Sequence, residues 1–330
     1  MLRRLTARSE RWPLSRPFRI ARGVKTAADV VVVNLQHGPH VGRGEAVPYA
    51  RYDESVESVL AQIASVSADI EAGLSRAELQ RKLAAGAARN AIDCALWDLE
   101  AQQAGRTVAD LAGVQTPGEI VTAVTVSLDE PARMSEAAAA IAGSPLIKVK
   151  VDAFDPLTSV QAVRAAAPEA RLIVDPNESW SASLLAELLP QLAALRVDLI
   201  EQPLAAAEDA SLENLKPAVP ICADESAHTS ADLERVARRY QAVNIKLDKT
   251  GGLTEALVMR ERVRQLGLTL MAGCMVSTSL SVAPALLVAQ DASFIDLDGP
   301  WWLAQDRENG MIFANGRMRA PRGLWGEPRA

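Results

Sequence analysis

The sequence contains few cysteines and histidines and no long apolar segment. Among 330 residues, the cysteines are Cys94, Cys222 and Cys274, with no CxxC pair. An odd, sparse count argues against a disulfide framework and fits a reducing, cytoplasmic compartment. The histidines His37, His40 and His228 form neither HExxH nor His-x-His, which argues against zinc. No apolar stretch reaches roughly 18 residues, so we expect no membrane span.

Charge is not concentrated in any part of the chain. The net charge is −6 at pH 7, and no run of five like charges occurs. This distribution argues against a nucleic-acid surface and against a polybasic membrane anchor. A small anionic substrate would therefore have to be held by individually placed cations.

The arginine-rich start of the chain has two possible interpretations. Residues 1–22 hold seven arginines and one acidic residue, which loosely resembles a transit peptide. However, Trp12, Pro13 and Pro17 interrupt the segment, and it runs directly into the valines at 30–33. We therefore expect it to form the first strand and loop of a domain.

Residues 1–118 are predicted to form an α+β capping domain. Strands are expected near Leu5 and Ala7, at 30–35 and at 41–46, with a turn at 37–40. From 53 to 115, apolar residues recur at helical spacing, for example at Val56, Val59, Leu60 and Ile63, and again at Ala91, Ile92, Ala95 and Leu96. A β-meander followed by helices is a unit of its own.

Residues 119–300 alternate between strand and helix patterns. Eight strands are expected, at 120–126, 146–151, 172–174, 198–201, 221–224, 243–247, 269–272 and 294–297, and alanine-rich helices are expected between most of them, at 134–142, 157–166, 182–193, 231–238, 254–266 and 279–289. Eight such units favour a modified, TIM-like (β/α)8 barrel of the α/β class over an open doubly wound sheet. The tail at 301–330 is expected to return and complete the capping domain.

Residues with acid, base or ligand chemistry end most of these strands. Lys150, Asp175, Glu201, Asp224 and Lys246 follow one another at intervals of 22 to 26 residues, and Asp296 and Asp298 lie two such intervals further on. A strand and its crossover helix take about this length. All these side chains should therefore meet at the C-terminal mouth of the barrel, where such folds carry their active sites.

Asp175, Glu201 and Asp224 end three consecutive strands. Three converging oxygen donors suit a hard divalent ion such as Mg²⁺. A single aspartate at such a position is usually a helix N-cap, but three in succession favour a metal site.

The lysines suggest proton transfer. Lys148 and Lys150 alternate on one strand, so both should point into the barrel mouth, and Lys246 should lie across the barrel. Neighbouring ammonium groups lower each other's pKa, which would suit a general base near neutral pH. Bases on opposite sides of one carbon permit epimerisation. The alternative is that Lys246 forms an ordinary ion pair with Asp248.

Five segments together resemble the enolase superfamily, in its muconate-lactonising subgroup. They are Lys148–Lys150, Val174–Trp180, Ile200–Leu204, Ala223–Ser226 and Asn244–Gly252. The resemblance covers essentially the whole chain. It implies a Lys base and Mg²⁺ that stabilise an enediolate, with Lys148 assisting. Pro176 departs from the small residue that the family often has there, and it removes one backbone donor.

Asp296–Pro300 is similar to the Asp-x-Asp segment of dipeptide epimerases, which receives the substrate α-ammonium group. The resemblance is closest to L-Ala-D/L-Glu epimerases, which are isomerases acting on a cell-wall dipeptide. It implies an arginine for the glutamate side chain, with Arg22 preferred over Arg19 and Lys25. A second capping loop would contain Tyr49, Arg51 and Tyr52. Further substrate contacts are assigned to Asn177, Asp248, Cys274 and Met275.

Other functions remain open at this level. An epimerase of other dipeptides or a cycloisomerase would use the same site, since fold does not settle substrate. A binding scaffold without activity is the non-enzyme alternative, but the complete set of ligands and bases argues against it. The expected partner is a small dipeptide, with no nucleic acid or membrane, and the chain is a possible homo-oligomer.

Overall fold

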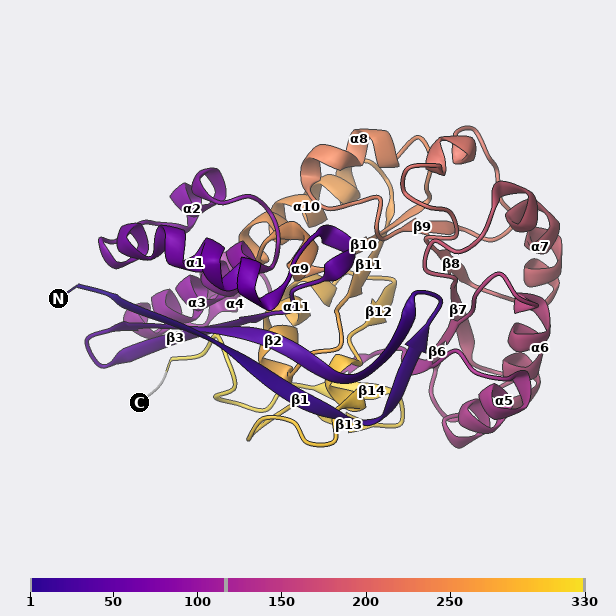
Figure 1. The fold of residues 1–330 in the computed structure, drawn as a ribbon, viewed down its shortest axis with the longest axis horizontal. Coiled ribbons are helices and arrows are strands. Elements are labelled where there is room, and N and C mark those ends of the chain that lie inside the picture. The colour runs from indigo at the N-terminus through magenta and orange to yellow at the C-terminus, as the bar shows by residue number, and fades with distance from the viewer. Residues whose placement is uncertain (1, 116–117, 329–330) are drawn as a thin grey trace.

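The computed structural model describes residues 2–115 and 118–328. Residues 1, 116 and 117 of the expected range 1–118, and residues 329 and 330 of the expected range 301–330, fall outside it. An N-terminal part of antiparallel strands and helices lies against a ring of parallel strands surrounded by helices (Figure 1). The β1–β2 hairpin reaches from the N-terminal part across to the barrel side (Figure 1).

The N-terminal sheet has the order β1-β2-β3 and is antiparallel, with β1 (Arg4–Ile20), β2 (Gly23–His37) and β3 (His40–Ala46). All three predicted strands are confirmed, and the arginine-rich start of the chain is a strand. β1 and β2 continue further than expected and meet in a tight turn at Ile20–Gly23. This hairpin end carries Arg22 over the barrel mouth.

Four helices follow: α1 (Val56–Glu71), α2 (Arg76–Lys82), α3 (Ala87–Ala104) and α4 (Val108–Ala112). Of these, α1 and α3 pack on the sheet, and α2 and α4 pack against α3. Ser55 and Ser75 cap α1 and α2 through capping boxes, which satisfy backbone N–H groups at each helix start. Gly44 lets α3 approach β3 closely, because a Cβ at this position would lie 2.1 Å from the Ala91 carbonyl oxygen. A core of valine, isoleucine, leucine and alanine side chains fills the space between sheet and helices.

The second sheet has eight parallel strands in the order β12-β11-β10-β9-β8-β7-β6-β5. They are β5 (Val124–Val126), β6 (Leu146–Lys150), β7 (Arg171–Asp175), β8 (Leu199–Glu201), β9 (Ile221–Ala223), β10 (Ala242–Ile245), β11 (Thr269–Gly273) and β12 (Phe294–Asp296). Ala123 N donates to Ile295 O at 2.7 Å and so brings the two outer strands together. The predicted TIM-like barrel is confirmed.

The first predicted barrel strand is partly wrong. Only Val124–Val126 joins the barrel, while β4 (Ile120–Val121) pairs with β14 (Arg317–Arg319), which in turn pairs with β13 (Ile312–Ala314). Apolar residues continue through both short strands, so periodicity alone could not locate the break.

Helices surround the barrel: α5 (Pro131–Ala140), α6 (Pro156–Ala166), α7 (Ala182–Ala194), α8 (Leu233–Val236), α9 (Leu247–Thr250), α10 (Leu253–Gln265) and α11 (Ser279–Ala289). Between β8 and β9 the connection holds only a short 3-10 helix, Asp209–Leu212. Within residues 2–115 and 118–328, no helix is both long and apolar enough to cross a bilayer.

The C-terminal tail contacts the N-terminal part at several points. Leu303 forms a β-bridge with Leu14, and Gly326 O accepts a 2.8 Å hydrogen bond from Val108 N. Arg307 joins Glu10 and Glu45 through ion pairs of 2.6 and 2.7 Å. The tail therefore fastens the N-terminal sheet beside the barrel mouth.

Candidate active site

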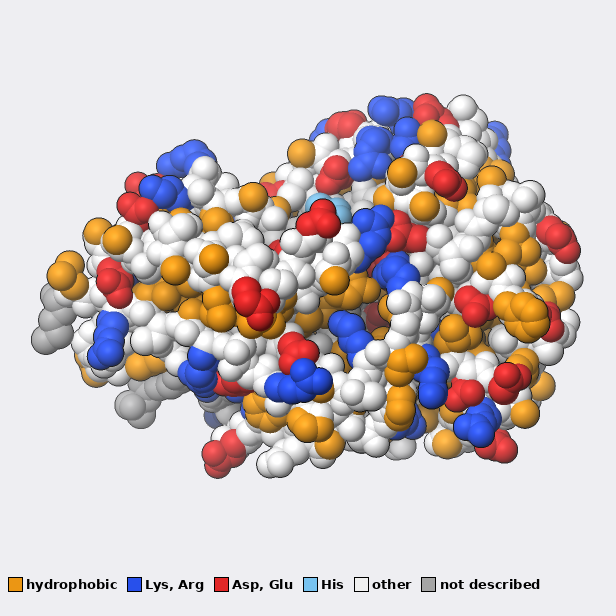
Figure 2. Space-filling model, in the orientation of Figure 1, with side chains coloured by type: hydrophobic (Ala, Val, Ile, Leu, Met, Phe, Trp, Pro, Cys, Tyr) orange, Lys and Arg blue, Asp and Glu red, His pale blue; other side chains and the backbone are white. Residues whose placement is uncertain are grey.

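A cavity of about 420 Å³ lies where the β1–β2 hairpin covers the barrel mouth. Its size is typical of small-molecule sites. Figure 2 shows basic and acidic side chains side by side along the line where the two parts of the molecule meet. The cavity takes lining residues from both parts, among them Phe18, Arg22, Lys25, Tyr49, Arg51, Lys148, Lys150, Asn177, Asp224, Lys246, Cys274, Met275, Asp296 and Asp298.

The three predicted metal ligands stand at neighbouring strand ends and are buried. Asp175 ends β7, Glu201 ends β8 and Asp224 directly follows β9. Asp175 Oδ1 accepts a 2.9 Å hydrogen bond from Asn177 N, the residue after Pro176. The proline therefore leaves this aspartate with a backbone donor one position further along.

Neighbouring polar groups hold the other two carboxylates in place. Glu201 Oε1 accepts a 2.9 Å hydrogen bond from Asn244 Nδ2, and Asp224 Oδ1 lies 2.6 Å from Lys249 Nζ. Lys249 is buried and also donates to Asn244 O at 2.9 Å. The role of Lys249 was missed in the sequence, although it stands inside the Asn244–Gly252 segment.

Each of the three predicted lysines contacts at least one of the three strand-end carboxylates. Lys150 Nζ lies 2.5 Å from Asp175 Oδ2, and Lys246 Nζ lies 2.6 Å from Asp224 Oδ2. Lys148 Nζ lies 2.7 Å from Glu201 Oε2 and contacts two further carboxylates, those of Asp175 and Asp296, at 3.0 and 2.7 Å. All three lysines line the cavity, as their positions on the strands predicted.

Asp248 is not the partner of Lys246, so the ordinary ion pair considered above is wrong. The Asp248 carboxylate accepts hydrogen bonds from Val47 N at 3.0 Å and from Asn90 Nδ2 at 2.8 Å. It is absent from the cavity lining and links α9 to the N-terminal part. The structure therefore does not bring this predicted substrate contact to the cavity.

At Lys246 and Lys148 the expected lowering of the pKa does not occur in this arrangement. Burial lowers the pKa of Lys246, but attraction from Asp224 and Glu201 outweighs it, so the pKa lies above its ordinary value. The pKa of Lys148 is likewise raised, because Asp175, Asp296 and Glu201 outweigh its burial. The attraction of the surrounding carboxylates exceeds the repulsion between neighbouring ammonium groups, and spacing in the sequence does not reveal this balance.

Glu201 carries the least compensated charge of the three strand-end carboxylates. Burial and the nearby Asp175 raise its pKa to about 7. Its Oε2 atom is buried and receives no well-directed hydrogen bond, although Lys148 Nζ is only 2.7 Å away. A buried carboxylate oxygen without a donor is costly unless a cation faces it.

The three strand-end carboxylates have the chemistry of a divalent-cation site. Within the described ranges, no three His, Cys, Asp or Glu side chains enclose an ion site as they stand. Lys148 bridges Asp175 and Glu201, and Lys246 stands between Glu201 and Asp224, at 3.9 and 2.6 Å. A hard cation prefers these three carboxylates, and its binding would require the ammonium groups to move aside.

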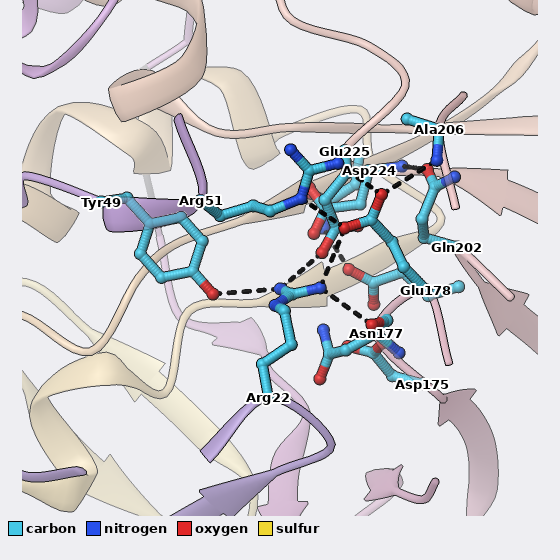
Figure 3. Close-up of polar contacts among 12 residues, drawn as sticks. Arg22, Tyr49, Arg51, Asp175, Asn177, Glu178, Gln202, Ala206, Asp224 and Glu225 are labelled. Atoms are coloured by element: carbon cyan, nitrogen blue, oxygen red, sulfur yellow. Dashed lines mark hydrogen bonds and ion pairs between the residues drawn. The ribbon is translucent and has the colours of Figure 1, made fainter. Parts of the chain in front are cut away.

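Arginines of the capping part close the rim of the cavity. Arg22 donates to Glu225 Oε1 at 2.7 Å, to Asn177 O at 2.8 Å, to Tyr49 Oη at 3.0 Å and to Glu178 Oε2 at 3.2 Å. Figure 3 shows its guanidinium at the centre of this network. The predicted Arg22 is thus at the site, but two carboxylates already neutralise it.

Arg51 completes the rim through Glu178. Its Nε and Nη2 atoms donate to the two Glu178 oxygens, each at 2.7 Å (Figure 3). Bidentate pairs of this kind fix orientation as well as charge. Glu178 and Glu225 were missed in the sequence, although each closely follows a predicted metal ligand in its segment.

Comparison with known proteins identifies the family. Residues 2–113 match the model of the mandelate racemase/muconate lactonizing enzyme N-terminal domain, and residues 132–324 match the enolase C-terminal domain-like model. The chain belongs to the enolase superfamily.

Two curated relatives within this superfamily share about half of the sequence. The L-Ala-D/L-Glu epimerase of Escherichia coli is 50% identical over 94% of this chain and 97% of its own. An N-acetyl-D-glutamate racemase of Pseudoalteromonas is 45% identical over 90% of this chain and 95% of its own.

Solved structures of the superfamily agree in fold and in the type of bound ligand. An enolase family member of Agrobacterium tumefaciens, with bound sodium and L-Ala-L-Glu, has a TM-score of 0.96 and 49% identity over 98% of this chain and 100% of its own. A dipeptide epimerase of Methylococcus capsulatus, complexed with Mg and L-Arg-D-Lys, has a TM-score of 0.89 and 31% identity over 98% and 99% of the two chains.

In this enolase-superfamily chain, Asp296 ends β12 and Asp298 follows it, and the two aspartates differ in their partners. Asp296 contacts Lys148 through Oδ2, while its buried Oδ1 has no hydrogen-bond partner. Asp298 Oδ2 accepts hydrogen bonds from Thr125 N at 2.8 Å and from Trp302 Nε1 at 3.3 Å. Burial and the charge of Asp296 raise the pKa of Asp298 to about 6. The pair therefore presents negative charge to the cavity.

Cys274 and Met275 lie at the end of β11, beside this aspartate pair, and both line the cavity. Cys274 N donates to Asp296 O at 3.1 Å, which ties the two strand ends together. Both residues therefore lie at the cavity, and their contact with the substrate stays a prediction.

Proposed function

We propose that this chain is a dipeptide epimerase that inverts the α-carbon of the second residue in L-Ala-D/L-Glu type substrates. The observation that carries the proposal is that Lys150, at the end of β6, and Lys246, directly after β10, face one cavity. The 50% identical E. coli relative and the L-Ala-L-Glu bound to the Agrobacterium structure support the choice of substrate.

Asp175, Glu201 and Asp224 are the residues that would hold Mg²⁺. The magnesium in the M. capsulatus epimerase and the buried Glu201 Oε2, which receives no well-directed hydrogen bond, support this assignment. The ion would supply positive charge for the substrate's terminal carboxylate and would stabilise charge that develops there. It would also compensate the carboxylates that hold the pKa of Lys246 high.

Three lysines of the chain have separate roles in the reaction. Lys150 or Lys246, depending on the starting isomer, removes the α-proton, and the opposite lysine, as an ammonium, returns a proton to the other face. Negative charge on the enediolate is stabilised by the buried Lys148 ammonium, which stands beside Glu201 and Asp175. The covering hairpin excludes water from the cavity.

Different residues recognise the α-ammonium group and the glutamate side chain of the dipeptide. The α-ammonium group is received by Asp296 and Asp298, whose carboxylates would repel an anion in its place. Arg22 contributes positive charge at the rim near the glutamate side chain. Asn177, Cys274 and Met275 contact the rest of the substrate. Because L-Ala-D-Glu occurs in the bacterial cell wall, we infer a role in murein peptide recycling.

The principal rival is racemisation of N-acetylglutamate, the activity named for the Pseudoalteromonas relative. That substrate has no ammonium group, so it would leave the charge of Asp296 and Asp298 uncompensated. Steady-state turnover of L-Ala-L-Glu and N-acetyl-L-glutamate, followed by chiral chromatography, tests the choice. We expect a preference for the dipeptide in kcat/KM; turnover of the acetylated amino acid alone would overturn the proposal.

A further inference from the structure

Asp248 is a buried carboxylate that stands two positions after Lys246 and does not line the cavity. One of its oxygens, Oδ1, accepts hydrogen bonds from both Val47 N, at 3.0 Å, and Asn90 Nδ2, at 2.8 Å. Val47 directly follows β3 and Asn90 lies in α3, so both donors belong to the N-terminal part. A residue that closely follows one of the two proposed bases is therefore anchored outside the barrel.

The turn that contains Asp248 also holds the backbone of Lys246. Lys246 is the N-cap of α9, and its carbonyl oxygen accepts hydrogen bonds from Lys249 N and Thr250 N, each at 3.0 Å. Asp248 lies between these residues in the single turn of α9. Because the base stands at the start of this turn, fixing Asp248 fixes the point from which the Lys246 side chain extends.

Helix α3 also supports the C-terminal end of the same turn. Arg89 Nη2 donates to Thr250 O at 2.6 Å, and Arg89 Nε donates to Gly251 O at 3.1 Å. Arg89 and Asn90 are adjacent in α3, which packs against α9. The N-terminal part therefore holds α9 through the Asp248 side chain and through two backbone carbonyl groups.

The opposite base is held by the barrel itself. Lys150 closes β6 and is paired in register with Asp175 of β7. Its Nζ atom lies 2.5 Å from Asp175 Oδ2 and 3.0 Å from Asn177 Oδ1. A change at Asp248 should therefore displace Lys246 without displacing Lys150.

We propose that Asp248 is a positioning residue for Lys246, because its two hydrogen bonds hold α9 where the Lys246 amine reaches the substrate α-carbon. This inference rests on the proposed epimerase function. Proton transfer depends steeply on such placement, since a misplacement of about 1 Å can lower a rate 10²-fold. Loss of the acceptor should slow proton transfer on the Lys246 face of the substrate and spare the Lys150 face.

The test measures loss of the substrate α-proton in D₂O with Mg²⁺ by ¹H NMR, starting separately from L-Ala-L-Glu and from L-Ala-D-Glu. Lys246→Ala identifies the isomer that faces Lys246, because the other isomer should still exchange through Lys150. For Asp248→Ala, we expect the isomer facing Lys246 to lose its proton about tenfold to a hundredfold more slowly. The other isomer should react at a rate close to that of the unaltered protein.

Three further variants separate positioning from a general effect on structure. Asp248→Asn keeps an oxygen acceptor without the charge and should restore both rates. Asn90→Ala removes one of the two donors and should shift the ratio of the two rates in the same direction as Asp248→Ala. Thr254→Val is the matched control, because Thr254 Oγ1 joins the barrel to α3 through Asp93 at 2.7 Å, further along the chain from Lys246; it should leave the ratio unchanged.

Equal slowing of both isomers in Asp248→Ala, or no slowing of either, would overturn the assignment. If Asp248→Ala does not fold, the ratio in Asn90→Ala decides by the same criterion. Failure of the epimerase function itself gives a different result, since the unaltered protein would then exchange neither isomer.

Discussion

Lys150 ends β6 and Lys246 directly follows β10, four positions away in the ring of eight barrel strands, so the two lysines lie on opposite sides of the cavity. Their ammonium groups contact different carboxylates, those of Asp175 and Asp224, at 2.5 and 2.6 Å. A substrate α-carbon held between them would meet an amine on each face. Removal and return of a proton on opposite faces is what inversion requires.

Replacing one base should separate exchange from inversion. Lys246→Ala should lower the rate of epimerisation by about 10²-fold to 10⁴-fold, the usual contribution of a general acid or base. Lys150 should still exchange deuterium from D₂O into the isomer whose α-proton faces it, which ¹H NMR would detect. Inversion at a rate close to that of the unaltered protein would contradict the two-base arrangement.

Removal of the metal should abolish turnover reversibly. After EDTA treatment and dialysis, we expect no epimerisation of L-Ala-L-Glu until Mg²⁺ is added. Glu201→Gln should weaken Mg²⁺ binding strongly in isothermal titration calorimetry, because it replaces one of three carboxylate ligands. Glu178→Gln is the control, since Glu178 pairs with Arg22 and Arg51 at the rim and should leave binding of the ion intact.

Binding of the substrate ammonium group should depend on pH. The pKa of Asp298 is raised to about 6 by burial and by Asp296, so its carboxylate is protonated below that value and ionised above it. The dipeptide ammonium stays charged throughout, and KM should therefore rise as the pH falls from 7 to 5. Asp298→Asn should show a higher KM at pH 7 and a smaller change over this range; an identical pH profile would argue against the assignment.

The link between the tail and the barrel should contribute to stability. Arg307 pairs with the fully buried Glu45 at 2.7 Å, and Thr278 N donates to Glu45 at 2.9 Å. Arg307→Met leaves this carboxylate without its cation, so we expect a loss of about 3 kcal/mol in the free energy of unfolding. Arg11→Met, which removes an exposed pair with Asp29, should lower the free energy of unfolding by less than about 1 kcal/mol. Urea titration of both variants measures the two losses. Equal losses would show that the buried pair has no special role.

Much of the barrel, and the polar residues at its strand ends, could be predicted because each strand has a recognisable local sequence pattern. A short apolar run followed by an acidic residue recurs at Asp175, Glu201 and Asp224, and the parallel arrangement brings these ends together. Lys148 and Lys150 were placed correctly for the same reason, since alternation along a strand fixes the face.

What could not be predicted depends on contacts between distant segments. Asp248 stands in a segment that also carries Lys246, but the partners that draw it from the cavity are Val47 and Asn90 in the N-terminal part. The pairing of Arg22 with Glu225 joins residues far apart in the sequence. The raised pKa of Lys246 depends on how many carboxylates surround it, which spacing alone does not give.

The central claim, that two lysines act on opposite faces of one carbon, is tested most directly by early turnover of L-Ala-L-Glu in D₂O with Mg²⁺. We predict that the first L-Ala-D-Glu formed carries deuterium at the glutamate α-carbon, because its proton comes from the lysine opposite the one that removed it. The recovered L-Ala-L-Glu should remain largely undeuterated at that time, as mass spectrometry of the separated isomers would show. Product that largely retains its original α-proton, or no product at all, would contradict the account.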